Sequence, residues 1–183
     1  MSVGVLSGED ILGLLDAVAH RLEKSPGGEP ATIVVVGGSF MALHGLRAGT
    51  ADVDTITRID DRLRKVIEDI AAERDLRPDW LNDRSAAFAP IGLDVMSCTT
   101  LFERRSLIVL GPPAHFVFLM KLFAARSVDY DDMVALWPVC SFGSAADAVS
   151  RFYAAYPHVE RDPHLVDFVQ GIASQSGGRP SPE

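Results

Sequence analysis

The stretch Thr32-Ile-Val-Val-Val36-Gly-Gly-Ser39, followed by Asp52-Val-Asp54, decides the fold class of this chain. Residues 31–36 form a short β-branched run bounded by turn residues, which predicts a buried strand. The two glycines end that strand, residues 39–46 predict a short helix, and residues 52–57 predict a second strand. A strand, a tight turn, a helix and a strand in this order predict a core that mixes helices with a sheet.

The rest of the chain predicts mixed elements in the first half and helices alone in the second. Ser7, with Asp10 three residues later, has the spacing of a capping box ahead of an amphipathic helix, and 25–30 is a loop. The further predicted elements are a helix at 60–75, strands at 92–97 and 107–110, and helices at 113–125, 130–137, 144–155 and 164–173. We expect an α/β (α+β) fold in one domain over 1–173, with a small mixed β-sheet core at 31–111, a helical part at 112–173 and a disordered tail at 174–183.

The composition excludes several classes of protein. The 183 residues fit one domain, and 48 % hydrophobic with 23 % charged residues is typical of a globular protein. No apolar run approaches the roughly 20 residues of a membrane-spanning helix, and the N-terminus lacks a signal-peptide pattern, so we expect a cytoplasmic protein. Cys98 and Cys140 are too few for a disulfide framework, and we expect reduced thiols. The net charge of −8 argues against a protein that coats nucleic acid, and the basic stretches Arg58–Lys65 and Arg104-Arg105 are either solvated surface or local contacts.

Asp52 and Asp54 have the spacing of a carboxylate pair on one face of a strand. Side chains two residues apart project from the same face, while Val53 turns into the core. Two carboxylates held side by side repel one another, and a divalent cation removes that cost. Mg²⁺ usually takes one or two carboxylates from a protein and fills its other positions with water and phosphate oxygens. The pair therefore predicts a magnesium site, and the alternative is a polar strand end.

The Gly37-Gly38-Ser39 turn has the composition of a phosphate contact. The third glycine of a dinucleotide fingerprint is missing, and no Gly-Lys-Ser/Thr follows, so neither of those nucleotide-binding loops is present. A strand-to-helix turn leaves backbone N–H groups that attract phosphate, Gly38 would let a triphosphate approach the backbone, and the Ser39 hydroxyl could donate to it. The alternative is a tight packing turn.

These residues resemble a known enzyme family. Gly37-Gly38-Ser39, a short helix, and then Arg47-x-x-Thr50-x-Asp52-x-Asp54 resemble the signature of the DNA-polymerase-β-like nucleotidyltransferase superfamily. Within it, the chain is most similar to bacterial nucleotidyltransferases of the AbiEii and mycobacterial MenT toxin type. Trp80-Leu-Asn-Asp83 and the run from Lys121 through Arg126 and Asp129 to Asp132 are similar to later motifs of that group, so that the resemblance covers about residues 31–136.

The resemblance implies roles for the first set of residues. Asp52 and Asp54 would hold Mg²⁺ and serve catalysis, and Gly38 and Ser39 would hold the triphosphate. Lys121 would reach a phosphate, a role that also suits a lone cation within an apolar run. The alternative for Lys121 is a side chain that snorkels from a core helix.

The remaining roles leave two questions open. Arg126, Asp129 and Asp132 would shape the nucleotide site or pair with one another, and Asp129 could instead cap the helix that follows it. A third carboxylate would act as general base on the acceptor hydroxyl. Asp94, alone among apolar residues on a predicted strand, is one candidate, and Asp132 is the other.

The implied activity is Mg²⁺-dependent transfer of a nucleoside monophosphate from an NTP to an acceptor hydroxyl, with release of pyrophosphate. By resemblance to the toxins of toxin–antitoxin systems, the acceptor would be the 3′ end of tRNA and the partner a cognate antitoxin protein. We expect tRNA contacts in the Arg58–Lys65 stretch. Two other hypotheses stay open: a nucleotidyltransferase acting on a small-molecule or protein hydroxyl, and a nucleotide-binding module without turnover.

Overall fold

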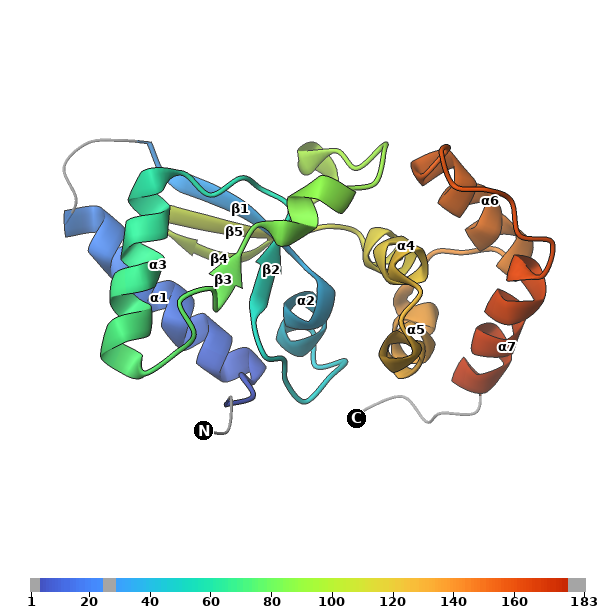
Figure 1. The fold of residues 1–183 in the computed structure, drawn as a ribbon, viewed down its shortest axis with the longest axis horizontal. Helices are drawn as coiled ribbons and strands as arrows, with labels where there is room; N and C mark the ends of the chain where they lie inside the picture. Colours follow the sequence, from blue (N-terminus) through green and yellow to red (C-terminus); the bar gives the residue numbers. More distant parts are fainter. Residues whose placement is uncertain (1–3, 25–28, 178–183) are drawn as a thin grey trace. The chain divides into compact units, whose positions relative to one another are not determined.

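The sheet and the C-terminal helices of this chain belong to two separate units. The computed structural model describes residues 4–24 and 29–177. Unit 1 comprises Met1–Ala89 and Asp94–Pro112, and unit 2 comprises Pro90–Leu93 and Pro113–Glu183. Among the described residues, unit 1 holds the sheet and three α-helices, whereas unit 2 is helical (Figure 1). The predicted mixed fold, with a small sheet followed by a helical C-terminal half, is confirmed.

Unit 1 is organised around a five-stranded mixed sheet in the order β3-β2-β1-β5-β4. The strands are β1 (Ala31–Val36), β2 (Val53–Thr55), β3 (Leu81–Asn82), β4 (Thr99–Arg104) and β5 (Leu107–Gly111). β1 is the central strand, parallel to β5 and antiparallel to β2. Its last four residues are all buried, which explains why its sequence is a continuous apolar run rather than an alternating one.

The register of the sheet separates a packed face from the face that carries Asp54. Val36 lies opposite Asp54, and Asp54 lies opposite Asn82 on the next strand, so these three side chains share one face. Val35 lies opposite Thr55 on the other face, where Val35 and Val53 belong to the main hydrophobic cluster.

Two helices, α1 (Gly8–Lys24) and α3 (Asp61–Arg74), pack over that hydrophobic face and contact each other, with α1 crossing obliquely behind α3 in the view of Figure 1. The predicted capping box of α1 is confirmed, because the Ser7 backbone N–H donates to Asp10 and the Asp10 N–H donates to the Ser7 hydroxyl. Since the apolar side chains of α1 join the same cluster as the strands, the core of unit 1 starts well before residue 31.

In its described residues, unit 2 contains four α-helices: α4 (Ala114–Ala124), α5 (Tyr130–Leu136), α6 (Ala145–Ala155) and α7 (Leu165–Ser176). Phe118 of α4 is fully buried and makes edge contacts with the rings of Trp137 and Phe142. Ser144 caps α6 by accepting a hydrogen bond from the Asp147 backbone N–H. No helix in the described part of the chain combines the length and the apolar character that crossing a bilayer requires.

Several predicted boundaries differ from the structure. The predicted strand at 92–97 is wrong, because this segment forms a turn and the 3₁₀ helix η2 (Val95–Ser97), with no neighbouring strand to pair with. Strands β3 and β4 were not predicted, and β2 is shorter than the expected 52–57. The helix α2 spans Gly37–Leu43 instead of 39–46. α7 continues to Ser176, past the predicted start of the tail at 174, and residues 178–183 lie outside the described residues.

Candidate functional site

The Asp54 carboxylate lies against the turn between β1 and α2. Gly37, the first residue of that turn, has a φ of 64°, a conformation that L side chains rarely adopt. A Cβ atom on Gly37 would lie 3.3 Å from Asp54 Oδ2. The glycine is therefore required both by its backbone conformation and by the closeness of the carboxylate. Asp54 is partly exposed, so its carboxylate reaches the surface beside the turn.

Gly38 is required by a contact within the chain. A Cβ atom there would lie 2.6 Å from Thr50 Oγ1 and 3.5 Å from Arg47 Nη1. The sequence analysis explained Gly38 by the approach of a triphosphate, and the structure supplies a packing reason, while the phosphate contact stays a prediction. Arg47 and Thr50 were given no role of their own, although the Arg-x-x-Thr-x-Asp spacing already pointed to them.

The loop that carries Thr50 is fixed to the segment ahead of α1. The Thr50 backbone N–H donates to the Leu6 carbonyl at 2.9 Å, and the Leu6 N–H donates to the Thr50 carbonyl at 2.7 Å. A Cβ atom on Gly49 would lie 2.7 Å from the Leu6 carbonyl oxygen. Thr50 is buried, so this bridge satisfies polar groups that have little access to water. The bridge holds the chain two residues before Asp52.

The Ser39 hydroxyl joins β1 to β2. Its side chain is buried, its Oγ donates to the Val36 carbonyl at 2.8 Å, and it accepts a hydrogen bond from the Asp54 backbone N–H at 3.3 Å. The sequence analysis gave this hydroxyl to a triphosphate. In the structure its proton already has a protein acceptor.

Asp52 lies one residue before β2, in a bend, and it is partly exposed. The argument that strand geometry places Asp52 and Asp54 on one face therefore applies only to Asp54. Across the described residues, no three His, Cys, Asp or Glu side chains gather into a group that could hold a metal ion. Two partly exposed carboxylates at one end of β2 suit Mg²⁺, which takes few protein ligands.

Asp94 is placed differently from the sequence prediction. It is exposed and lies at the start of η2, where its carboxylate accepts a hydrogen bond from the Met96 N–H at 2.9 Å. Its apolar neighbours Val95 and Met96 are also exposed, so Asp94 does not lie among buried apolar residues as the sequence suggested. Its role as general base stays a prediction.

In unit 2, Lys121 of α4 forms a buried cluster with two carboxylates. Its Nζ donates to Asp129 Oδ1 at 2.8 Å and to Asp132 Oδ2 at 2.7 Å. The three side chains are only 8 %, 12 % and 11 % exposed, so Lys121 does not snorkel to the surface. The cluster combines one ammonium with two carboxylates.

The segment between α4 and α5 explains this pairing. α4 ends at Ala124 and is capped by Ala125, a residue in the left-handed conformation, and the 3₁₀ helix η3 (Ser127–Asp129) leads into α5. Asp129 stands at the N-cap position of α5 as the alternative expected, but its side chain makes no capping bond there and its carboxylate binds Lys121 instead. The expectation that Asp129 and Asp132 lie on one side is confirmed by their shared contact with Lys121. Arg126 is exposed, and its role stays a prediction.

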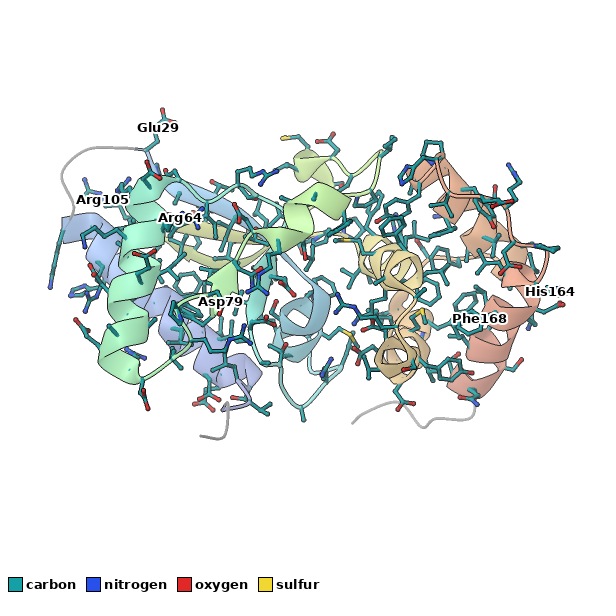
Figure 2. All side chains as sticks on the ribbon, viewed as in Figure 1. Glu29, Arg64, Asp79, Arg105, His164 and Phe168 are labelled. Atoms are coloured by element: carbon teal, nitrogen blue, oxygen red, sulfur yellow. The ribbon has the colours of Figure 1, made fainter. Side chains whose placement is uncertain are left out.

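Most of the basic residues proposed for tRNA contact have partners inside unit 1. Arg62 donates to the carbonyls of Leu22 and Glu29, so it joins α3 to the end of α1 and the start of β1. Arg64, labelled in Figure 2, donates to the Ile59 carbonyl and remains half-exposed. Lys65 pairs with Asp69 one helical turn away. Much of this basic charge is thus engaged within the fold.

The two cysteines are free thiols and are poor nucleophiles in these surroundings. Burial raises the pKa of the Cys140 thiol to about 12. Burial, and then the charge of Asp94, raises the pKa of Cys98. Both thiols are therefore protonated at neutral pH, which argues against cysteine-based catalysis.

Comparisons with protein families, curated proteins and solved structures give no match to this chain. The functional argument therefore rests on the residues and their geometry.

Proposed function

We propose that this protein is a Mg²⁺-dependent nucleotidyltransferase of the DNA-polymerase-β-like superfamily, which transfers a nucleoside monophosphate from an NTP to an acceptor hydroxyl. The observation that carries the proposal is the position of Asp54 Oδ2, 3.3 Å from where a Cβ atom of Gly37 would be. A metal-binding carboxylate beside a glycine turn is the arrangement that a metal-bound triphosphate requires, because the phosphates must contact the ion and the backbone together.

Asp52 and Asp54 fit the ion as its protein ligands. They are hard oxygen donors, both are partly exposed, and Mg²⁺ prefers one or two carboxylates with water and phosphate oxygens in the remaining positions. When bound, the ion would offset the charge of the triphosphate and of the leaving pyrophosphate.

The proposed reaction exchanges one bond at the α-phosphorus of the NTP, and residues of the chain would accept the proton that the acceptor hydroxyl loses. The acceptor oxygen forms a bond to the α-phosphorus, the bond from that phosphorus to the bridging oxygen breaks, and pyrophosphate leaves with that oxygen. The acceptor proton passes to a carboxylate, either the exposed Asp94 or the lysine-bound Asp132. By the resemblance, Lys121 would contact a phosphate oxygen; in the structure its Nζ donates to Asp129 and Asp132.

The proposals for the acceptor and for the partner protein rest on the resemblance alone. On that basis we propose tRNA as the acceptor, through its 3′ end, and a cognate antitoxin protein as the partner. Arg58, the exposed residue at the start of the basic stretch, is the first candidate for an RNA phosphate contact.

The test incubates the purified protein with Mg²⁺, each α-labelled NTP in turn, and total tRNA. Label should move to tRNA, and the Asp54→Asn variant should lose at least about a hundredfold of the rate, because it removes a metal ligand. The matched control is Asp69→Asn, a surface carboxylate on α3 paired with Lys65, which should retain the wild-type rate. Asp94→Asn and Asp132→Asn identify the base by their effect on the rate.

Label on the protein itself or on a small molecule would show that the acceptor is a protein or small-molecule hydroxyl and not tRNA. If no label is transferred with any NTP or acceptor while the protein still binds nucleotide, the protein is a nucleotide-binding module and not a nucleotidyltransferase. Normal transfer by both Asp52→Asn and Asp54→Asn would overturn the metal site.

A further inference from the structure

The Ser39 hydroxyl occupies the place where the glycine turn meets the strand that carries Asp54. We propose that Ser39 is a positioning residue, which holds the Asp54 carboxylate at the turn, and that it is not a ligand of the triphosphate. This inference rests on the proposed function, since it assigns a task to Ser39 within the same metal site.

The hydrogen bonds of Ser39 leave little capacity for a ligand. A serine hydroxyl has one proton to donate, and here that proton goes to the Val36 carbonyl at 2.8 Å. The same oxygen accepts the Asp54 N–H at 3.3 Å, and the side chain has no exposed surface. If the hydroxyl turned to a phosphate, it would give up its bond to the Val36 carbonyl in a buried place, which is costly.

The two partners of Ser39 are the last residue pair of the β1–β2 ladder. Val36 and Asp54 lie directly opposite one another, and the chain leaves β1 immediately after Val36 to form the turn. By bonding to both residues, Ser39 fixes the backbone of Asp54 relative to Gly37. The carboxylate is then held 3.3 Å from the Gly37 Cβ position. A residue that orients a metal ligand in this way typically contributes a factor of about 10 to 100 in metal affinity.

Thr55 provides a matched control on the next residue of β2. Its side chain is also fully buried, its hydroxyl donates to the Val34 carbonyl at 2.8 Å, and it accepts the Thr57 N–H at 3.0 Å. Like Ser39, Thr55 therefore donates to a carbonyl of β1 and accepts a backbone N–H, but that N–H belongs to Thr57, just past its own strand, and Thr55 lies on the opposite face from Asp54. Loss of either hydroxyl removes the same kind of contact, and only Ser39 supports the carboxylate.

The experiment measures Mn²⁺ binding to the full chain by electron paramagnetic resonance of the unbound ion, with Mn²⁺ as the probe for the magnesium site. ATP binding in EDTA is measured separately. Ser39→Ala should weaken Mn²⁺ binding about tenfold and leave ATP binding without metal within twofold of the wild type. Thr55→Val should leave both affinities within twofold.

Unchanged Mn²⁺ affinity in Ser39→Ala, with weaker metal-free ATP binding, would overturn the proposal and make Ser39 a phosphate ligand. If Ser39→Ala does not fold, the fallback variant is Ser39→Cys, whose thiol is a weaker hydrogen-bond donor. Its Mn²⁺ affinity should be lower than that of the wild type, and an affinity equal to that of the wild type would overturn the proposal. Absence of Mn²⁺ binding in both the wild type and Thr55→Val would instead refute the metal site of the proposed function.

Discussion

Replacement of Lys121 by methionine should destabilise the protein more than any exposed charge substitution. The change keeps most of the side-chain volume of α4 but leaves the carboxylates of Asp129 and Asp132 facing each other without their shared ammonium. All three side chains are about nine-tenths buried, so water screens the repulsion poorly. Removal of one partner of a buried ion pair costs about 3–5 kcal/mol.

The assay is urea unfolding at pH 7, followed by the fluorescence of Trp137, which lies in unit 2, in a Trp80→Phe background. With an m-value of about 2 kcal/mol per molar urea, a loss of about 4 kcal/mol lowers the midpoint by about 2 M. Asp129→Asn should cost clearly less than Lys121→Met, because one ammonium and one carboxylate remain.

The control is Lys65→Met, which breaks an exposed pair with Asp69 one helical turn away. Such pairs contribute at most about 0.5 kcal/mol, so its midpoint should stay close to that of the reference protein. A midpoint for Lys121→Met within the range of this control would refute the reasoning, since the ammonium would then contribute nothing to the buried cluster.

Three further predictions concern other parts of the chain. Gly37→Ala and Gly45→Ala both place alanine at a positive φ, and each should cost about 1 kcal/mol by thermal unfolding, but only Gly37→Ala, beside the carboxylate, should also reduce Mn²⁺ binding. Hydrogen bonds from Ser7 lower the pKa of Asp10, so the Asp10 carboxylate contributes to stability above about pH 4 and loses that contribution as the pH falls. The difference in thermal midpoint between Asp10→Asn and the wild type should therefore shrink from pH 7 to pH 3. Iodoacetamide at pH 8, followed by mass spectrometry, should label Cys98 before Cys140, whose pKa burial raises to about 12.

The elements that could be predicted from sequence are those whose pattern is local. β1 was placed at its observed bounds because a strand buried on both faces is apolar at nearly every position. The first helix was placed by its Ser7–Asp10 capping box, which is a contact between residues three apart.

The elements that escaped prediction depend on distant partners. β4 is an edge strand with only two half-buried apolar residues, Leu101 and Phe102, between exposed ends, so its apolar signal is short. It pairs with β5 through a turn at Arg105, a residue labelled in Figure 2. The apolar residues at 93–96 imitate a strand, but no neighbour offers them a ladder. Pairing and register are properties of the whole sheet, and one short segment does not encode them.

The candidate site also contains one part that the sequence predicts and one part that depends on the fold. The grouping of Gly37 with Asp54 follows from a recognisable spacing along the chain. The partners of Ser39 and Lys121 could not be assigned, because a hydroxyl or an ammonium can bind several groups and only the fold decides which of them lie within hydrogen-bonding distance.

The bridge between Leu6 and Thr50 has a practical consequence for anyone who prepares this protein. Removal of the first seven residues would strip two backbone hydrogen bonds from Thr50, which is 6 % exposed, and would release the loop that precedes Asp52. A shortened protein could then keep its sheet and still lose metal binding. Affinity tags and truncations are therefore better introduced at the C-terminal end, and a loss of Mn²⁺ binding in an N-terminally trimmed preparation should not be taken as a property of the full chain.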